Sequence, residues 1–370
     1  MAPVVTALRA YEPDVEVRVA LTGQHTTLVD QVLEAFALDP EYKIWDSDYD
    51  LAIMTPDQSL DQVMQRAIDG LSGVVRDFSP DVLLVEGDTA TVFAASLVGF
   101  LARVKVGHVE AGLRSGDKWA PFPEEVFRRL TDVVSDYYFA PTTRAKENLE
   151  AEGISAEAIN VTGNTVVDAV QQAAAREHTV ENEALRSVLE NPTSRLVLLT
   201  AHRRESFGKP LEEIFTAVRA LADRVPDIHI VYPVHPNPSV LEPARAMLAG
   251  HPRIDLTEPL SYLDIVAAMR AASLILTDSG GIQEEAPTFG VPVLVLRNVT
   301  ERPEGVDAGV AELVWANAER IIDRSLKALS RGPRGAHANP YGDGRAGERI
   351  ADIIVADLMG RPRTTQDWTG

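Results

Sequence analysis

The chain has no cysteine among its 370 residues. This absence excludes disulfide bonds, thiolate catalysis and metal sites built on cysteine. The eight histidines are no substitute, because none of them are paired at the helical spacing that places two metal ligands on one face. We therefore expect no bound metal.

Long apolar runs are also missing. No run approaches the roughly 20 residues of a membrane span, and the opening MAPVVTALRA lacks the charged-then-apolar layout of a signal peptide. Positive charge is scarce, because 35 Lys and Arg stand against 55 Asp and Glu, a net charge of −20. Such a chain should not bind nucleic acid or anionic membrane nonspecifically. We expect a cytoplasmic protein with neither partner.

What the sequence does contain is a regular alternation of strand and helix patterns, which predicts an α/β fold with parallel sheets. Its length and 45% hydrophobic content suffice for two domains. The composition shifts after Gly163-Asn164, ahead of the polar segment 178–195. We expect a first Rossmann-like domain of residues 1–163, completed by residues 345–370, and a second of residues 164–344.

The expected elements follow from apolar periodicity and from Gly and Pro punctuation. Strands are expected at 15–21, 82–85, 104–109, 137–140, 159–161, 196–200, 228–232, 254–256, 274–277 and 292–297. Helices are expected at 1–10, 26–36, 59–78, 91–101, 124–134, 210–224, 262–272, 282–289, 318–329 and 345–359. The polar tail 360–370 is expected to be frayed.

The stretch LILTDSGGIQEEAPTFGVPVLVLRNVTERPE, residues 274–304, is typical of a strand, a turn, a short helix and a second strand. Gly280 and Gly281 allow close backbone approach, and the free amides at the helix start suit a diphosphate. Glu284 and Glu285 can accept hydrogen bonds from sugar or ribose hydroxyls. Arg302 can offer a forked donor to phosphate. An ordinary tight turn is the alternative interpretation of the two glycines.

Polar side chains also follow the ends of other predicted strands, where ligands of open parallel sheets bind. Asp88, Glu110 and His202 each stand at such an end, and Glu124 begins a helix behind Pro123. Crowded carboxylates raise one another's pKa, which suits acid/base chemistry. Each residue also has a structural interpretation: a helix cap for Asp88, a turn or salt bridge for Glu110, the helix dipole for Glu124, and a structural histidine for His202. Four arginines could hold phosphate: Arg128, Arg203, Arg204 and Arg302.

Several segments occur in a characteristic order: EGDT, GHVEAGLRSGD, PFPEE, GNTVVD, AHRRESFG, YPVHPNP, TDSGGIQEEAPTFGVPVLVLR and TERPEG. This series closely resembles the non-hydrolysing UDP-N-acetylglucosamine 2-epimerases, from residue 1 to about residue 358. The resemblance implies a glycosyltransferase-B fold, in which two Rossmann-like domains flank a deep cleft and a C-terminal helix returns to the first domain. It also implies a homodimer and no organic cofactor.

The activity implied is the interconversion of UDP-GlcNAc and UDP-ManNAc. The family expels UDP from the anomeric carbon to give 2-acetamidoglucal and then re-adds it, which requires an acid, a base and stabilisation of the departing anion. By motif match the catalytic residues are Asp88, Glu110, Glu124 and His202. The substrate-binding residues are Arg128, Ser279, Gly280, Gly281, Glu285 and Arg302. The sequence does not assign the base and the acid among the carboxylates.

The chain departs from the family pattern at several positions. Phe127 stands where an Asn is usual. Gln24, Arg203 and His235 match an allosteric UDP-GlcNAc site of some bacterial members, whereas Thr27 and Asp57 replace its usual Gln and Arg. The family's first strand and GTRPE-like turn are absent here, and we expect a start site placed too far downstream or a trimmed chain. The alternative is that Met1 is the native start.

Two other functions compete with epimerisation. A retaining glycosyltransferase of the same architecture would use the Gly-Gly helix and a ribose-binding Glu, without needing three clustered carboxylates. A nucleotide-sugar sensor would keep the phosphate turn and needs no acid/base set. The sequence names neither the exact sugar nor the pathway.

Overall fold

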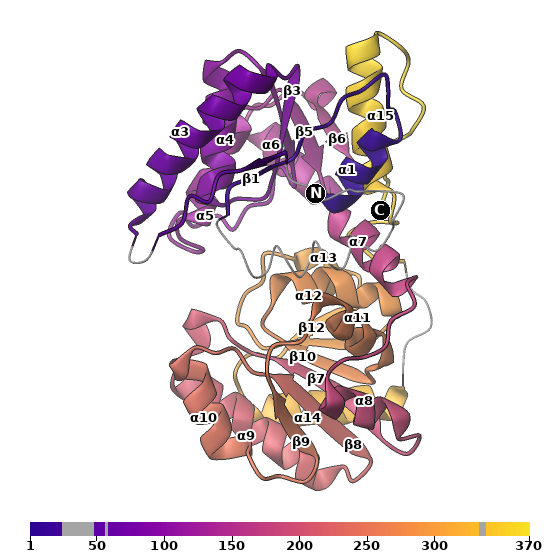
Figure 1. The fold of residues 1–370 in the computed structure, drawn as a ribbon. Coiled ribbons are helices and arrows are strands. Elements are labelled where there is room, and N and C mark those ends of the chain that lie inside the picture. The colour runs from indigo at the N-terminus through magenta and orange to yellow at the C-terminus, as the bar shows by residue number, and fades with distance from the viewer. Residues whose placement is uncertain (24–47, 56–57, 333–337) are drawn as a thin grey trace. The chain divides into compact units, whose positions relative to one another are not determined.

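The computed structural model describes residues 1–23, 48–55, 58–332 and 338–370. The described chain divides into two compact units, Met1–Ala169 with Tyr341–Gly370, and Val170–Pro340. Each unit contains a parallel sheet with helices packed on it (Figure 1). The α/β fold expected from the alternating pattern is therefore confirmed.

The first unit is built on a four-stranded parallel sheet in the order β3-β4-β5-β6. Its strands are β3 (Val82–Glu86), β4 (Lys105–Val109), β5 (Tyr137–Ala140) and β6 (Ile159–Val161). Its helices are α1 (Ala2–Arg9), α3 (Leu60–Phe78), α4 (Ala90–Leu101), α5 (Glu124–Val134), α6 (Thr143–Ala151) and α15 (Ala346–Met359), with the 3-10 turn η1 (Ala156–Ala158). The register pairs Glu86 with Val109, so the residues that follow β3 and β4 emerge at the same edge of the sheet.

The helix α15 completes this unit, although it lies at the far end of the sequence. It packs beside α1, as Figure 1 shows, and a Cβ added to Gly347 would lie 2.7 Å from the carbonyl oxygen of Pro3. The first turn of α15 is held by Asp168, whose carboxylate accepts the N–H groups of Ala346 at 3.1 Å and Gly347 at 2.8 Å. Glycine is therefore required at position 347 by the close approach of the two helices.

The strand expected at residues 15–21 is mostly wrong. Only β1 (Ala20–Leu21) forms, and it pairs with β2 (Tyr49–Asp50) in a separate two-stranded sheet. The ladder stops because the N–H of Val19 is donated to the side chain of Asp48 at 2.8 Å. Val15 and Val17 still pack against the core through their side chains. The helix expected at residues 26–36 lies outside the described residues.

The frayed tail expected after α15 is also wrong. The carboxylate of Asp352 accepts the N–H groups of Thr364 and Thr365, both at 2.7 Å. Trp368 donates its backbone N–H to the carbonyl of Val161 at 2.8 Å. The backbone N–H of Val161 is in turn donated to the carboxylate of Asp367 at 3.1 Å. The tail thus satisfies backbone groups of β6, the edge strand, which explains why a polar segment is ordered.

The second unit contains a six-stranded parallel sheet in the order β12-β11-β10-β7-β8-β9. Its strands are β7 (Arg195–Thr200), β8 (Ile228–Pro233), β9 (Ile254–Thr257), β10 (Leu274–Thr277), β11 (Val293–Val295) and β12 (Ala311–Leu313). The strand order reverses between β7 and β10, which lie side by side. In open α/β sheets this switch point is where ligands bind, at the carboxyl ends of the strands.

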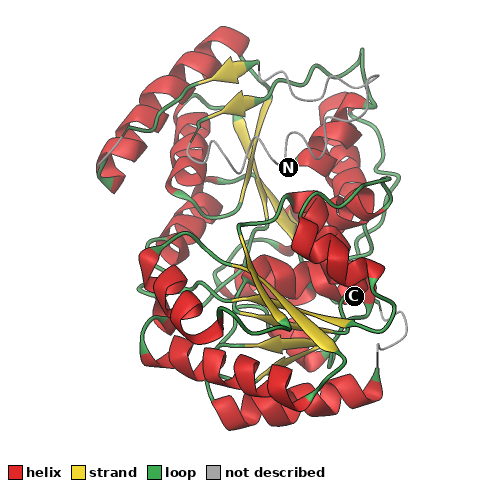
Figure 2. Ribbon diagram, turned by 60° about the horizontal axis from the view of Figure 1, so that its bottom comes forward, coloured by secondary structure: helices red, strands yellow, loops and turns green. Residues whose placement is uncertain are grey.

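Helices cover both faces of this second sheet (Figure 2). They are α8 (Glu183–Glu190), α9 (Lys209–Arg224), α10 (Pro238–Leu248), α11 (Tyr262–Ala271), α12 (Gly280–Glu285), α13 (Pro303–Asp307) and α14 (Ala318–Arg331), with the 3-10 turns η2 (Arg204–Ser206) and η3 (Ala286–Phe289). The helix α7 (Thr165–Ala174) carries the chain from the first unit into the second. No helix in the described part of the chain is long and apolar enough to cross a membrane.

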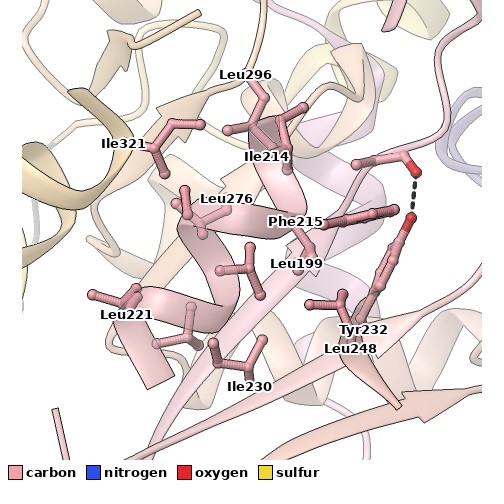
Figure 3. Close-up of a cluster of buried hydrophobic side chains, with 14 of the residues drawn as sticks. Leu199, Ile214, Phe215, Leu221, Ile230, Tyr232, Leu248, Leu276, Leu296 and Ile321 are labelled. Carbon is pink, nitrogen blue, oxygen red and sulfur yellow. Dashed lines mark hydrogen bonds between the residues drawn. The ribbon is translucent and has the colours of Figure 1, made fainter. Parts of the chain in front are cut away.

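Alternate residues of β7 feed two separate cores, one on each face of the sheet. Val197 and Leu199 belong to one cluster, whereas Leu196 and Leu198 belong to the other. Figure 3 shows the first cluster, in which side chains of α9 such as Phe215 meet those of the strands. The hydroxyl of the buried Tyr232 donates a hydrogen bond to the carbonyl of Ala201 at 2.6 Å (Figure 3).

Some helices had no clear signal in the sequence, and α8 is an example. It lies in the segment 178–195, which is polar and charged overall. The helix buries only Leu185 and Val188 and is capped by Asn182, whose side chain accepts the N–H of Leu185 at 3.0 Å. Two apolar contacts and a cap were enough to form it.

Candidate active site

Two threonines lie at the switch point of the second unit, where β7 and β10 end side by side. Thr200 and Thr277 end β7 and β10, are paired in register, and share a hydrogen bond of 2.6 Å between their hydroxyl groups. The next residues along the two strands lead to His202 and Asp278. The sequence predicted a site here from His202 and the Asp278-Ser279-Gly280-Gly281 turn, and the structure brings these residues together.

Asp278 links the turn that follows β10 to the loop that follows β7. Its side chain is 0% exposed, and its Oδ2 accepts the backbone N–H groups of His202 at 2.7 Å and Arg203 at 2.8 Å. Its Oδ1 is buried without a hydrogen-bond partner among the described residues and lies 3.7 Å from Nδ1 of His202. Burial raises the pKa of Asp278, against the opposing effect of His202. The sequence indicated only a turn residue at this position.

His202 keeps 38% of its side chain exposed, so it can reach a ligand. Burial of the remainder lowers the pKa of His202, which favours the neutral imidazole at pH 7. Its ring stacks on that of His235 with the centroids 5.6 Å apart. The structure thus places a predicted catalytic residue in contact with a residue predicted for an allosteric site.

The glycine turn begins α12 two residues earlier than expected. Ser279 occupies the N-cap position, and the helix passes into η3 and ends at Gly290, whose φ of 66° is left-handed. A Cβ on Gly281 would meet no atom within 4 Å, whereas a Cβ on Gly280 would lie 2.8 Å from Cζ of Arg302. The guanidinium of Arg302 therefore lies against the start of the helix.

Arg302 is held there by acidic partners that the sequence did not reveal. Its Nε donates to Oε1 of Glu284 at 3.0 Å, and its Nη1 lies 3.5 Å from Oε2 of Glu301. The side chain of Glu284 is 4% exposed, so this ion pair is well shielded from water. The interpretation of Glu284 as a sugar contact is less suited to the structure than a role in positioning Arg302.

Glu285, predicted as a ribose contact, is 9% exposed and lies beside Tyr262. Burial, followed by the charge of Glu284, raises the pKa of Glu285 to about 8, while a hydrogen bond with Tyr262 opposes the rise. The protonated form therefore predominates at pH 7. In that form the carboxyl group can donate a hydrogen bond as well as accept one.

In the first unit, Asp88 follows β3 and is bound by Arg128. Nη2 of Arg128 donates a short hydrogen bond to Oδ2 of Asp88, and Nη1 donates to Oε2 of Glu125 at 3.1 Å. Asp88 does not cap α4, because the capping side chain is that of Thr89. Arg128 was predicted to bind substrate, and the structure shows it holding a predicted catalytic carboxylate.

Glu110 follows β4 with a left-handed φ of 68°. Its Oε1 accepts a hydrogen bond from Nδ2 of Asn164 at 2.9 Å. A Cβ on Gly87 would lie 3.7 Å from Oε2 of Glu110. Glu110 therefore lies against the Gly87-Asp88 turn, so two of the predicted carboxylates are brought to the same sheet edge.

Beneath this turn lies His108, which the sequence placed only inside a strand. It is fully buried, with Nδ1 2.6 Å from Oδ1 of Asp132 and Nε2 2.8 Å from the carbonyl oxygen of Gly87. Both ring nitrogens face acceptors, an arrangement that suits the imidazolium form, which can donate from both. Although burial opposes the charge, the Asp132 carboxylate raises the pKa of His108.

Glu124 occupies the first turn of α5 and is half-buried. Among the described residues it makes no hydrogen bond with Asp88 or Glu110, so the structure does not join it to that pair. The neighbouring Phe127 is buried and stacks on Phe93 of α4, with the ring centroids 5.8 Å apart. The departure from the usual Asn at this position thus provides a packing contact between α4 and α5.

The predicted allosteric residue Gln24 lies outside the described residues, as do Thr27 and Asp57. Arg203 contributes its backbone N–H to Asp278, as described above. Within the ranges that the structure describes, no three His, Asp or Glu side chains are grouped so as to hold a metal ion.

Comparison with known proteins identifies the family. A family model described as UDP-N-acetylglucosamine 2-epimerase matches residues 7–355. The UDP-N-acetylglucosamine 2-epimerase of Escherichia coli strain K12 is 46% identical over 369 residues, which cover 96% of this chain and 94% of that protein. The crystal structure of a Listeria monocytogenes relative aligns with a TM-score of 0.91 and 44% identity, over 100% of this chain and 95% of that one.

A second solved structure is the UDP-GlcNAc 2-epimerase from Neisseria meningitidis bound to UDP-GlcNAc. It aligns with a TM-score of 0.85 and 40% identity, over 98% of this chain and 96% of that one. These matches extend over both units and confirm the glycosyltransferase-B-like fold as well as the resemblance found in the sequence. The chain therefore belongs to the UDP-N-acetylglucosamine 2-epimerase family, and it is an isomerase.

Proposed function

We propose that the protein interconverts UDP-GlcNAc and UDP-ManNAc by eliminating UDP, forming 2-acetamidoglucal and adding UDP back. The observation that carries this mechanism is the placement of Asp88 and Glu110 after neighbouring strands, with Glu110 lying against the Gly87-Asp88 turn. The relative from Neisseria meningitidis, which is bound to UDP-GlcNAc, supports the substrate.

The chemistry explains why carboxylates are needed. The proton on carbon 2 of the sugar is not next to a carbonyl group, so direct removal is difficult. Departure of UDP from the anomeric carbon develops positive charge on the sugar and makes that proton more acidic. One carboxylate takes the proton, and a carboxylic acid returns a proton to the opposite face when UDP adds back.

In this proposal Asp88, Glu110 and Glu124 are the carboxylates that transfer protons or stabilise the cationic sugar. Asp88 is ion-paired with Arg128 and Glu110 accepts a hydrogen bond from Asn164. Glu124 lies at the start of α5 and supplies the third group.

The second unit supplies the residues for UDP. The backbone of Ser279, Gly280 and Gly281 and the guanidinium of Arg302 would bind the diphosphate, and His202 would lie beside it. Glu285 would contact the ribose. Support comes from the open space at Gly281 and from the contact of Arg302 with the start of α12.

Incubation with UDP-GlcNAc in heavy water, followed by proton NMR, tests the function. We expect UDP-ManNAc that carries deuterium at carbon 2. Free ManNAc would instead indicate the hydrolysing reaction. Substrate that stays intact but shows bound-state shifts would indicate a sensor, and UDP release that depends on an added sugar acceptor would indicate a glycosyltransferase.

A further inference from the structure

The side chain of Asn164 donates a hydrogen bond from Nδ2 to Oε1 of Glu110 at 2.9 Å. Asn164 lies 54 positions further along the chain, at the start of α7, and its side chain is buried. Its backbone N–H is donated to the carbonyl of Tyr341 at 2.7 Å. Tyr341 is the residue at which the chain re-enters the first unit. Asn164 is thus anchored from two parts of the same unit.

The orientation of the Asn164 amide is fixed by its second contact. Oδ1 accepts the backbone N–H of Val166 at 3.0 Å. Because the carbonyl end of the amide is used in this way, the Nδ2 end must face Glu110, and it can only donate. An oxygen that accepts from such a donor is stabilised in the ionised carboxylate.

Glu110 has reason to need such an anchor. A left-handed backbone at a non-glycine residue is uncommon and persists where the surroundings determine it, and the φ of Glu110 is 68°. Its side chain has several rotatable bonds, so an unheld carboxylate would sample many positions. One oxygen is tied to Asn164, and the other lies beside Gly87.

We propose that Asn164 is a positioning residue for the reaction, which aims the carboxylate of Glu110 and keeps it ionised through the hydrogen bond from Nδ2. The inference rests on the proposed function, in which Glu110 transfers a proton. Asn164 is anchored by Val166 and Tyr341, and it therefore fixes Glu110 relative to both segments of the first unit.

The charged groups around this contact are already paired. His108 lies two residues before Glu110, interacts with it electrostatically, and is held by Asp132. Asp88 is paired with Arg128. Glu86, at the end of β3, is paired with the α-amino group of Met1 and accepts a hydrogen bond from Thr165. These are the charged groups near the contact on which a new charge at position 164 can also act.

Two substitutions separate the two contacts of Asn164. Asn164→Asp and Asn164→Ser both keep an oxygen that can accept the N–H of Val166, so the start of α7 stays capped. Both remove the donor to Glu110, and only the aspartate adds a like charge. Asn317→Asp is the matched control, because Asn317 is an exposed N-cap whose side chain accepts the N–H of Arg320 at 2.9 Å.

For the full chain acting on UDP-GlcNAc, we expect kcat to fall about 100-fold in Asn164→Asp and at least tenfold in Asn164→Ser. The acid limb of the pH profile should move to higher pH in both variants, because each loses the donor that stabilises the ionised carboxylate, and it should move further in Asn164→Asp, which adds a like charge. KM and the thermal midpoint should change little, and Asn317→Asp should match the wild type. Unchanged kcat and pH profile in Asn164→Asp would overturn the inference while leaving the proposed function intact.

A second measurement does not depend on activity. The Glu110 carboxyl carbon can be followed by carbon-13 NMR in protein labelled at glutamate, with Glu110→Gln used to assign the signal. Its titration should move to higher pH in Asn164→Asp. If the signal titrates at the same pH in the wild type and both variants, Asn164 does not act on Glu110, whatever the enzyme does to UDP-GlcNAc.

Discussion

Asp278 faces His202 with both of its carboxylate oxygens, but only one of them is hydrogen-bonded to it. Oδ2 accepts the backbone N–H of His202 at 2.7 Å, and Oδ1 lies 3.7 Å from Nδ1 of the same residue's ring. The carboxylate is fully buried, and Oδ1 has no hydrogen bond elsewhere in the described ranges. A ligand that draws the imidazole inward would close this distance and fix the tautomer that carries a proton on Nδ1.

We therefore predict that Asp278→Asn lowers kcat ten- to a hundredfold with little loss of stability. The amide oxygen can still accept the N–H groups of His202 and Arg203, so the two loops remain joined. The amide NH2 would then face Nδ1 and favour the opposite tautomer of His202, an effect known to impair catalytic histidines. Steady-state kinetics and thermal melting measure the two quantities.

Asp255→Asn is the matched control for this prediction. Asp255 pairs with His229 at 2.7 Å on the surface of the same unit and away from the switch point. Loss of the charge of Asp255 should leave kcat within twofold of the wild type. Equal effects of the two substitutions would show that Asp278 has no special role.

The sequence predicted elements well where apolar periodicity decides them. The helix at 124–134 and the strands at 137–140 and 159–161 have the bounds that were expected. It failed where a partner distant in sequence decides the outcome. The tail is ordered because Asp367 meets Val161 from 206 positions away. The strand at 15–21 stops because Asp48 takes the N–H of Val19.

The same distinction holds for the candidate site. Strand ends and turn glycines pointed to Asp88, Glu110, His202 and Gly281 from local pattern alone. The residues that hold them were missed, because Asn164, His108 and Asp278 carry no local signal that separates them from a cap, a strand residue and a turn residue. Their roles depend on tertiary contacts, such as the approach of Asn164 to Glu110 across 54 positions.

The buried carboxyl group of Glu285 should make stability depend on pH. Burial raises its pKa from 4.5 to about 8. The folded state therefore binds this proton more tightly than the unfolded state, and stability should fall as the pH rises from about 4.5 through 8. Each pKa unit corresponds to about 1.4 kcal/mol, so the loss from this group is at most about 5 kcal/mol.

We predict that Glu285→Gln removes this component, so that the variant gains stability over the wild type as the pH rises from 6 to 9. Urea unfolding at several pH values measures the free energy of unfolding of each protein. Glu312→Gln, at a half-buried position of β12 in the same unit, is the control and should keep the wild-type slope. Parallel slopes for the wild type and Glu285→Gln would contradict the prediction.

The two glycines of α12 should respond differently to substitution. A Cβ added to Gly281 would meet no atom within 4 Å, so we expect Gly281→Val to fold normally. The valine would occupy the space into which the diphosphate must come close to the backbone, and we expect UDP affinity to fall at least tenfold. Calorimetric titration with UDP measures the affinity.

Gly73→Val provides the control, because Gly73 of α3 also has no atom within 4 Å of an added Cβ. It should bind UDP like the wild type. Gly280→Ala should instead displace the guanidinium of Arg302, because the added Cβ would lie 2.8 Å from Cζ of Arg302. Wild-type affinity in Gly281→Val would place the diphosphate away from this helix start.

The last prediction concerns the proposed catalytic groups themselves. Asp88→Asn, Glu110→Gln, Glu124→Gln and His202→Ala should each lower kcat by about a hundred- to ten-thousandfold, the range of positioned acid and base groups. Their effects on stability should differ. Asp88→Asn leaves the buried Arg128 with Glu125 as its remaining carboxylate partner among the described residues, so this variant should also melt at a lower temperature. Glu124→Gln should not.

Glu150→Gln is the control for these carboxylates, because Glu150 lies on the surface of α6 and pairs only loosely with Lys146 at 3.9 Å. It should keep the wild-type rate. If one of the proposed variants retains more than about half of the wild-type rate, the residue substituted in it does not transfer protons in the reaction. For Asp88, a loss of activity that cooling or a stabilising osmolyte restores would indicate that Arg128 needs its partner for folding, whereas a loss that persists in the folded variant assigns the carboxylate to the chemistry.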